Sequence, residues 1–206
     1  FNLIDGIDGL AGGYSILCSA MFGISYYRLG EYNYPLVVLS GVIIGSVIGF
    51  LYFNLSNYRD NKIFMGDTGS LSLGFAISVM TVLFVNTNGT MNDYQGWKFN
   101  APIASGIALS IIPIYDTCRI FTKRTLRGKS PFAADKSHIH HFMIRMGLRH
   151  DQVTLSLAVI KLFFIGLIFL CSGLNDHIMI PIVALTAVAL GLRLDVITLR
   201  RIKVIQ

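Results

Sequence analysis

The sequence predicts an all-α polytopic membrane protein in which residues 1–206 form a single transmembrane domain. Hydrophobic residues make up 53% of the chain and charged residues only 14%, a balance that is too apolar for an ordinary soluble domain. About six segments approach the roughly 20 residues that a helix needs to cross about 30 Å of hydrocarbon. These segments are residues 10–29, 35–53, 71–85, 102–121, 155–174 and 178–194.

Lysine and arginine are distributed unevenly between the two ends of these segments. Of the 17 basic residues, 14 lie on the same side as the N-terminus, whereas the other side has only Arg28 and Lys98 and one more, Lys161, lies within a segment. The positive-inside rule therefore predicts that the N-terminal side faces the cytoplasm. The net charge of +6 then reflects orientation and attraction to anionic headgroups or phosphorylated ligands, rather than nucleic-acid binding.

Within the second segment, Gly41, Gly45 and Gly49 recur at every fourth position. Small residues at this spacing predict close packing of the segment against a neighbouring helix. A flexible or lipid-facing helix is the alternative.

The stretch FMGDTGS at residues 64–70 joins the second and third segments and places Asp67 where the chain re-enters the membrane. A carboxylate there is costly to desolvate unless a cation or a ligand compensates, so Asp67 is a candidate functional residue. The free N–H groups and the positive dipole end of the following helix suit a phosphate group. The alternative is that Asp67 only caps that helix.

Two further carboxylates occur in NLIDGIDGLAGG, residues 2–13, directly before the first segment. Asp5 and Asp8 are three residues apart and would share one face if the stretch were helical. Two acids this close repel each other unless a cation or several N–H donors lie between them, which indicates a divalent metal or a nucleotide. The alternative is a hairpin-like turn at each Asp-Gly pair.

Asn54 and Phe64 flank the loop that leads to Asp67. The amide of Asn54, at the membrane edge, is suited either to a base or ribose or to capping the end of a helix. Phe64 is suited either to stacking on a planar base or to anchoring the chain at the membrane interface.

The fourth segment ends in PIYDTCR, residues 113–119. Asp116 and Arg119 are one helical turn apart, and a structural salt bridge between them is favoured over direct chemistry.

Residues 122–154 form a long basic loop on the cytoplasmic side, centred on SPFAADKSHIHH at 130–141. Its three histidines could donate hydrogen bonds to phosphate or sugar oxygens. A zinc site is the competing function, but no further ligand lies at a suitable spacing, and a solvated surface cluster is the other alternative. Because the acids and the histidines all fall on the basic side, a shared site is favoured over independent caps and turns.

Five motifs in this order and spacing resemble the polyprenyl-phosphate N-acetylhexosamine-1-phosphate transferase superfamily, glycosyl transferase family 4. They are NLIDGIDGLAGG (2–13), FN (53–54), FMGDTGSL (64–71), PIYDTCR (113–119) and SPFAADKSHIHH (130–141). The His-Ile-His-His form is similar to the bacterial undecaprenyl-phosphate N-acetylglucosaminyl-1-phosphate transferases, whereas the phospho-MurNAc-pentapeptide translocases usually have three adjacent histidines. The resemblance extends from residue 1 to about residue 149.

The resemblance implies an enzyme of the bacterial inner membrane that transfers a HexNAc 1-phosphate, with GlcNAc 1-phosphate as the first choice, from a UDP-sugar to undecaprenyl phosphate. UMP is released, and the product starts cell-surface glycan assembly. The implied cofactor is Mg²⁺, with Mn²⁺ as an alternative, because a metal and positive donors must offset the repulsion between two polyanions. The oligomeric state stays open, a homodimer included.

The matching motif positions imply a role for each of twelve residues. Four would hold the metal and the nucleotide diphosphate: Asp67, the Mg²⁺ ligand, with Asn2, Asp5 and Asp8. Two would contact the uridine: Asn54 and Phe64. Six would hold the sugar phosphate: Arg119, Arg124, Lys136, His138, His140 and His141. Lys136 stands where relatives often have Arg, which softens bidentate phosphate recognition.

One motif of the family is absent. A paired Asp-Asp, to which activation of the lipid phosphate or metal binding is ascribed, does not occur in these residues. The chain begins with Phe1 inside a motif and without a charged leader, so we expect it to be the later part of a longer protein. On its own it is therefore expected to be inactive.

Two other classes compete with this assignment. Intramembrane aspartyl proteases use a Tyr-Asp pair and a Gly-x-Gly-Asp motif, which residues 115–116 and 64–67 imitate in part. However, Phe64 replaces the first glycine, the order is reversed and the histidines have no role. A transporter with buried acids predicts charges at mid-membrane depth, whereas only Lys161 is central here.

Overall fold

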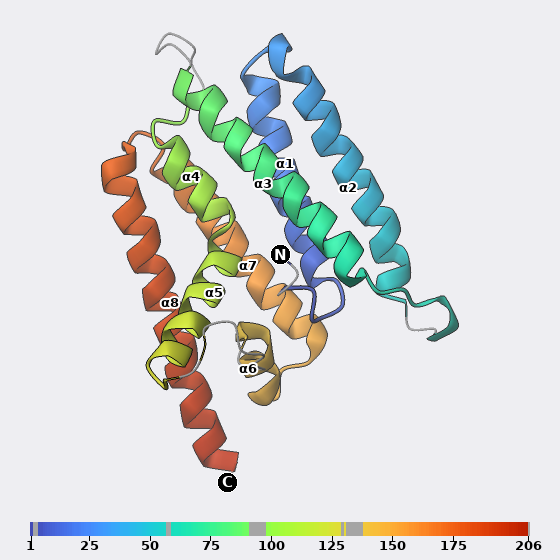
Figure 1. Cartoon of the computed structure of the whole chain (residues 1–206), viewed down its shortest axis with the longest axis vertical. Coiled ribbons are helices and arrows are strands. Elements are labelled where there is room, and N and C mark those ends of the chain that lie inside the picture. The colour runs from blue at the N-terminus through green and yellow to red at the C-terminus, as the bar shows by residue number, and fades with distance from the viewer. Residues whose placement is uncertain (2–3, 57–58, 91–97, 129, 131–137, 206) are drawn as a thin grey trace.

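Every regular element in the described part of the chain is a helix (Figure 1). The computed structural model describes the chain outside residues 2–3, 57–58, 91–97, 129, 131–137 and 206. The helices are α1 (Leu10–Arg28), α2 (Tyr34–Asn54), α3 (Gly66–Thr90), α4 (Pro102–Leu109), α5 (Ile111–Thr125), α6 (Ile139–Arg145), α7 (His150–Leu170) and α8 (Asp176–Ile205), with two 3-10 turns, η2 (Glu31–Asn33) and η3 (Arg59–Asn61). Pro35 and Pro102 stand in the first turns of α2 and α4, where the missing N–H is not needed.

Within the described residues, four stretches are long and apolar enough to cross a membrane: Glu31–Asn54, Gly66–Thr90, His150–Leu170 and Asp176–Ile197. The consecutive helices α4 and α5 make a fifth if they are counted as one bent span. The predicted segment 10–29 forms α1, which is not among the spans found in the described residues. The all-α polytopic membrane fold is thus confirmed, with four or five such spans rather than about six.

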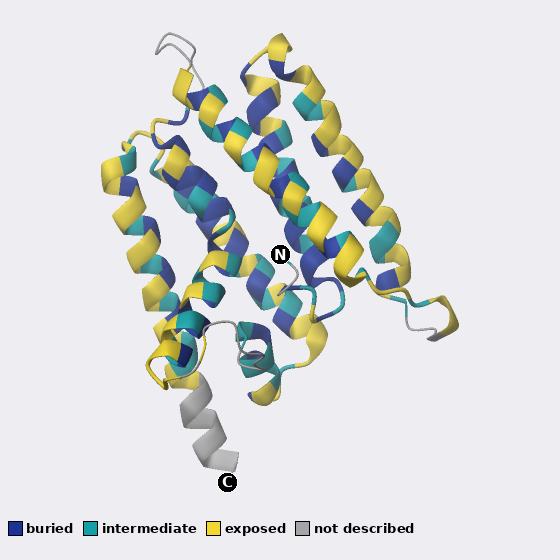
Figure 2. Cartoon of the chain, in the orientation of Figure 1, coloured by how far each residue is buried: buried dark blue, intermediate teal, exposed yellow. Residues whose placement is uncertain are grey.

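The interior position of α1 accounts for its more polar composition. More than half of its residues are buried, whereas α2 buries only four of its 21 residues (Figure 2). α1 packs against α2, α3 and α7, and the Tyr26 hydroxyl donates a hydrogen bond of 2.7 Å to the Met80 carbonyl oxygen on α3. A helix surrounded by other helices can carry polar side chains because its neighbours, rather than lipid, satisfy them.

The predicted packing role of the glycines on α2 is wrong. A Cβ atom at Gly41, Gly45 or Gly49 would meet nothing within 4 Å. The close approach between α1 and α2 occurs instead at Gly12 and Gly23 of α1, where a Cβ atom would come within 2.7 Å of Leu51 and 3.1 Å of Ser40 side-chain atoms. The alternative of an open face on α2 therefore holds for these three positions.

A sharp break at Ser110 separates α4 from α5, and the two helix axes differ in direction by 73°. Non-helical backbone inside a membrane needs partners within the protein. The Leu109 carbonyl oxygen finds them on α1, where it accepts hydrogen bonds from the Tyr14 hydroxyl and from the Cys18 thiol, the latter at 3.5 Å. Lys161 of α7 is fully buried behind this contact, with its Nζ 4.2 Å from the centre of the Tyr14 ring.

The described parts of the predicted site motifs lie at one end of the bundle (Figure 1). The segment before α1, the connection between α2 and α3, and helix α6 all gather at the end where α8 also terminates, the lower end in the view. The opposite end holds the connections from α1 to α2, from α3 to α4 and from α7 to α8. Alternation of long helices across the bundle is what brings motifs from distant parts of the sequence together.

Candidate active site

The centre of the candidate site is the Asp-Gly loop, which we define as residues 4–9. This loop consists of turns, and α1 begins only at Leu10. The helical arrangement that would have placed Asp5 and Asp8 on one face is therefore absent, and the hairpin-like turns are the better description. The two carboxylates point to different partners.

Two hydrogen bonds attach the Asp-Gly loop to α2 and α7. The Asn54 side chain, at the end of α2, links the Asp-Gly loop to the segment before α3. Its Oδ1 accepts from the Gly9 N–H at 2.7 Å, and its Nδ2 donates to the Ile63 carbonyl oxygen at 2.9 Å. The Thr154 hydroxyl of α7 donates to the Asp8 carbonyl oxygen at 3.1 Å. Gly9 has φ of 75°, a left-handed conformation that favours glycine. Of the two roles predicted for Asn54, these bonds support the one of fixing a helix end.

Lys62 holds the Asp8 side chain, with Nζ 2.5 Å from Oδ2. The same Nζ lies 5.8 Å from the centre of the Phe64 ring, and Phe64 is 75% exposed. An exposed aromatic ring beside a lysine offers a flat apolar surface next to a positive charge. From the sequence, Lys62 was considered only as one of the basic residues. Its contacts with Asp8 and Phe64 add it to the candidate site.

Asp5 and Asp67 are brought close enough to influence each other electrostatically. Burial raises the pKa of Asp5, and the negative charge of Asp67 raises it further. Asp67 is exposed in the first turn of α3. Two neighbouring carboxylates offer the hard oxygen ligands that Mg²⁺ prefers, and Mg²⁺ in nucleotide enzymes is often bound by one or two carboxylates plus substrate phosphates. These residues therefore fit the implied cofactor, although no group of three His, Cys, Asp or Glu side chains in the described part is arranged around a common metal position.

The rings of the three histidines cluster together, and one of them contacts the Asp-Gly loop. The rings of His140 and His141 are 4.2 Å apart between centres, and the rings of His138 and His140 are parallel at 5.8 Å. His140 is buried, and its Nε2 lies 2.5 Å from the position that a Cβ atom would take at Gly6. Only glycine allows this direct contact between the imidazole and the loop backbone.

His140 is a neutral ring at physiological pH. Burial, together with the neighbouring His141 and His138, lowers its pKa to about 4. A neutral imidazole has one N–H donor and one acceptor nitrogen. His140 can therefore donate a single hydrogen bond to an oxygen of a ligand, but it does not supply positive charge.

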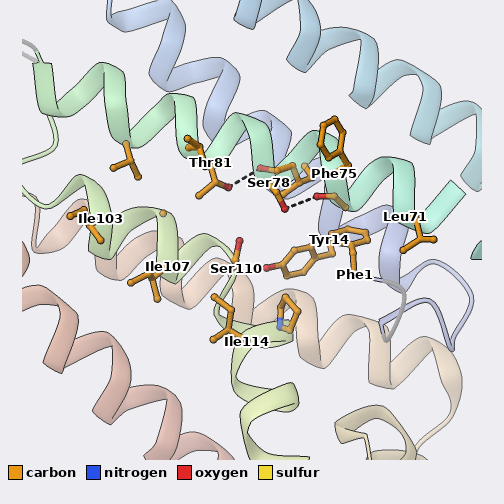
Figure 3. Close-up of a pocket in the computed structure, with 16 residues that line it drawn as sticks. Phe1, Tyr14, Leu71, Phe75, Ser78, Thr81, Ile103, Ile107, Ser110 and Ile114 are labelled. Atoms are coloured by element: carbon orange, nitrogen blue, oxygen red, sulfur yellow. Dashed lines mark hydrogen bonds between the residues drawn. The ribbon is translucent and has the colours of Figure 1, made fainter. Parts of the chain in front are cut away.

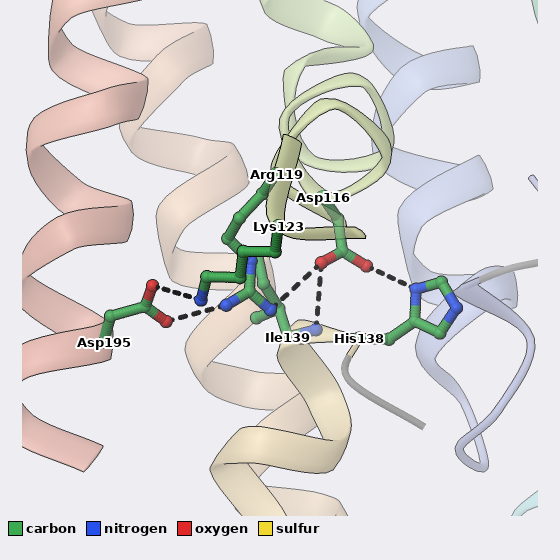
Figure 4. A network of polar contacts seen from close by, with 6 residues as sticks. All are labelled: Asp116, Arg119, Lys123, His138, Ile139 and Asp195. Atoms are coloured by element: carbon green, nitrogen blue, oxygen red, sulfur yellow. Dashed lines mark hydrogen bonds and ion pairs between the residues drawn. The ribbon is translucent and has the colours of Figure 1, made fainter. Parts of the chain in front are cut away.

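A buried polar network links α5, α6 and α8 behind the histidines (Figure 4). Asp116 is 8% exposed and accepts hydrogen bonds from His138 Nδ1 at 2.9 Å and from the Ile139 N–H at 3.0 Å. The predicted pair between Asp116 and Arg119 is present at 3.5 Å, but Arg119 contacts Asp195 more closely, at 2.7 Å. Asp195 also binds Lys123 at 2.7 Å.

The remaining predicted residues fall into two groups. Arg119 and Arg124 are buried on α5 at the same end of the bundle, and the guanidinium carbon of Arg119 lies 4.9 Å from the centre of the Phe142 ring. Asn2 and Lys136 lie outside the described residues.

An apolar groove of about 550 Å³ opens between α3 and the broken span α4–α5 (Figure 3). Phe1 and Tyr14 lie at one end of it, together with Leu71 of α3. Leu71 is one helical turn beyond Asp67, so the groove begins close to the carboxylates. The groove therefore joins an apolar, membrane-level surface to the polar end of the bundle.

Comparison with known proteins shows the family of the chain. The chain is 36% identical over 173 residues to the probable undecaprenyl-phosphate N-acetylglucosaminyl 1-phosphate transferase of Bacillus subtilis (strain 168), an alignment that covers 84% of the chain and 43% of the relative. The sequence model of glycosyl transferase family 4 matches residues 1–85. The chain belongs to glycosyl transferase family 4.

Other members of glycosyl transferase family 4 show the same degree of similarity. The undecaprenyl-phosphate alpha-N-acetylglucosaminyl 1-phosphate transferase of Yersinia pestis is 36% identical, over 82% of the chain and 44% of the relative. The decaprenyl-phosphate N-acetylglucosaminephosphotransferase of Mycobacterium tuberculosis (strain CDC 1551 / Oshkosh) is 31% identical, over 75% of the chain and 39% of the relative. The chain thus spans less than half of the length of these family members.

Two residues of the candidate site could not have been found from their spacing in the sequence. Thr154 is 146 residues from Asp8, and Asp195 is 76 residues from Arg119. Lys62 gave a weak signal, because it lies five residues before Asp67 in the same short loop.

Proposed function

We propose that this chain forms part of an enzyme that transfers a HexNAc 1-phosphate from a UDP-sugar to undecaprenyl phosphate and releases UMP. GlcNAc 1-phosphate is the first choice, because the relatives from B. subtilis and Y. pestis carry N-acetylglucosaminyl in their names. The product would begin the assembly of a cell-surface glycan. The site would face the cytoplasm of the bacterial inner membrane, since 14 of the 17 basic residues are assigned to that side of the chain.

The proposal is carried by the proximity of Asp5 to Asp67 and of His140 to the Asp-Gly loop, beside an apolar groove that begins one helical turn beyond Asp67. Asp67 raises the pKa of Asp5, and His140 packs on Gly6, the next residue along the loop. Leu71, one turn beyond Asp67, lines the groove. A reaction between a water-soluble nucleotide sugar and a lipid phosphate needs such a polar site at the edge of a membrane-level surface.

In this reaction an oxygen of the lipid phosphate forms a bond to the phosphorus attached to the sugar. The bond between that phosphorus and the oxygen bridging it to the uridine-bearing phosphate breaks, and UMP leaves with the electron pair. Asp67 and Asp5 are the residues that would hold Mg²⁺, which when bound neutralises phosphate charge. Lys62, beside Asp8, is placed to offset the charge of the leaving phosphate, and His140 to donate a hydrogen bond as a neutral ring.

The two alternative functions have less support. An aspartyl protease would pair Asp67 with Asp116, but Asp116 is hydrogen-bonded to His138 and to the Ile139 N–H. The acid whose pKa is raised by the charge of Asp67 is Asp5. A transporter would place acids at mid-membrane depth, whereas Asp5 and Asp67 lie at helix ends.

Release of UMP from UDP-GlcNAc in detergent with undecaprenyl phosphate tests the proposal. The chain should be assayed alone and after it has been supplied with the N-terminal part of the B. subtilis relative. We expect UMP release only in the second case, dependent on Mg²⁺ or Mn²⁺ and lost on addition of EDTA. UMP release by the chain alone would refute the expectation that it is inactive by itself. No release from any UDP-HexNAc by the completed protein would refute the transferase assignment.

A further inference from the structure

The Asp116 carboxylate occupies an unusual position between a helix start and an imidazole. It is buried near the end of the broken span, and its two oxygens accept from three groups on α5 and α6 (Figure 4). Oδ2 lies 2.9 Å from His138 Nδ1, and Oδ1 lies 3.0 Å from the Ile139 nitrogen. The third group is the Arg119 guanidinium, 3.5 Å from Oδ1.

These contacts fix both the backbone and the ring of the histidine segment. Ile139 is the first residue of α6, and His138 precedes it in an extended conformation without a side-chain cap of its own. The Ile139 N–H has no partner within the helix, so Asp116 satisfies it from another element. An ionised carboxylate can only accept hydrogen bonds, so His138 Nδ1 must carry a proton. In the neutral ring the lone pair is then on Nε2.

We infer that Asp116 is a positioning residue that sets the orientation and the tautomer of His138. The effect reaches the site because the His138 ring is parallel to that of His140, with centres 5.8 Å apart, and His140 contacts the Asp-Gly loop at Gly6. The inference rests on the proposed function only where it concerns the rate of transfer. The tautomer itself can be observed without any activity.

Asp116 is itself held by a chain of charges from α8. Arg119 bridges Asp116 and Asp195, and Asp195 also binds Lys123. Arg119 is 8% exposed, so this support is largely shielded from solvent. A guanidinium on this side adds a charged donor to the two donors from His138 and the Ile139 N–H, so the carboxylate is held from both sides.

The substitution Asp116→Asn separates the two contacts. The amide keeps an oxygen that can accept from the Ile139 N–H, but its NH₂ group faces His138 Nδ1, which must then act as acceptor. The proton of His138 moves to Nε2, so the tautomer reverses while the shape of the side chain is retained. A reversed tautomer is the recognised consequence of the equivalent change in serine proteases.

Nitrogen-15 spectra of histidine-labelled protein in detergent measure the tautomer directly. The chain has five histidines, and the substitution His138→Gln identifies the signal of His138. We expect protonated Nδ1 in the native protein and protonated Nε2 in D116N. Protonated Nε2 in the native protein would overturn the inference even if D116N fails to fold. Asp151→Asn is the matched control, because Asp151 is 66% exposed and pairs with the exposed Arg149; its His138 signal should be native.

Kinetics of the completed protein distinguish positioning from mere structural support. We expect D116N to lower kcat by about 10- to 100-fold, the range for partners that orient a functional ligand, with little change in KM for the UDP-sugar. In an H138Q background the same substitution should cost almost nothing further, because Asp116 acts through His138. An equal loss in both backgrounds would show a structural role and overturn the inference. If the native protein releases no UMP, the proposed function fails, while the spectra still decide the role of Asp116.

Discussion

Asp67 and Asp116 lie at the same end of the bundle but in opposite surroundings. Asp67 is exposed in the first turn of α3. It lies near a second acid, because its negative charge raises the pKa of Asp5. Asp116 is 8% exposed and accepts from His138, the Ile139 N–H and Arg119. Among the described residues, Asp67 thus has a second acid nearby, whereas Asp116 is engaged by three donors.

This difference separates a residue that is suited to gain a ligand from one that maintains the structure. Repulsion between Asp5 and Asp67 is relieved when a cation binds between them. Removing a partner from the Asp116 network instead leaves a buried charge uncompensated. Substitution at the first region should therefore lower activity with little loss of stability, whereas truncation at the second should also lower stability.

The largest effect is expected on activity at Asp67. Asp67→Asn should lower UMP release by the completed protein about a thousandfold, because it removes a ligand from a metal that contributes several kcal/mol to the reaction. The free energy of unfolding should change by less than about 1 kcal/mol, the size of a helix-dipole effect. Asp60→Asn, at an exposed acid in the preceding loop, is the matched control. A loss of melting temperature without loss of activity would remove the distinction drawn above.

The next effect is on stability at Asp116. Asp116→Ala leaves Arg119 and the Ile139 N–H without this acceptor and should lower the free energy of unfolding by about 3 kcal/mol. In a chain of this size the melting temperature, followed by circular dichroism in detergent, should fall by about 6 °C or more. Asp151→Ala, in an exposed ion pair, should stay within about 0.5 kcal/mol of the native protein. Equal behaviour of the two variants would contradict the view that the Asp116 network maintains the fold.

A smaller effect is expected at Gly6, where the two regions meet. A Cβ atom at Gly6 would lie 2.5 Å from His140 Nε2, so Gly6→Ala must displace the ring or the Asp-Gly loop. Displacement by about 1 Å at a reacting site can cost up to about 100-fold in rate, and we expect a loss of about 10- to 100-fold in kcat/KM. Gly13→Ala is the control, since a Cβ atom there meets nothing within 4 Å. Native activity in G6A would show that the contact has no part in catalysis.

Acidification should destabilise the protein through His140. The pKa of His140 falls from 6.5 to about 4 on folding, so between these values the unfolded chain binds a proton that the folded chain does not. The free energy of unfolding therefore decreases as the pH falls from 6.5 towards 4. Melting temperatures of native protein and H140Q over this range measure the effect as a difference in slope. H177Q, at an exposed histidine, should keep the native slope; a native slope in H140Q would exclude His140 as the cause.

A small effect on stability is expected at Lys62. Lys62→Met removes the contact of 2.5 Å with Asp8, but both side chains are about a quarter exposed, so the loss should be no more than about 1 kcal/mol. If Lys62 offsets phosphate charge, the activity of K62M should fall by more than its stability, and K62R should retain more activity than K62M. A loss of stability as large as that of D116A would place Lys62 in the structural group.

The accuracy of the sequence-based predictions varied with the range of the interactions involved. Asp67 at a helix start and the pair between Asp116 and Arg119 are local features, and both are present. The glycines of α2 were assigned to a helix interface and instead meet nothing. Their spacing shows that a close approach is permitted, but not which face of a helix has a neighbour. The structure placed that approach at Gly12 and Gly23 instead.

The sequence by itself determined the all-helical membrane architecture, the clustering of acids and histidines at the basic end, and the family. These properties follow from composition, hydrophobic segment length and motif order, all of which are read along one chain. Only the tertiary structure decided that Asp5 faces Asp67, that His140 packs on Gly6, and that Asp116 orients His138. Such contacts join residues 22 to 134 positions apart, and they depend on helix packing and on the break at Ser110, which local sequence does not specify.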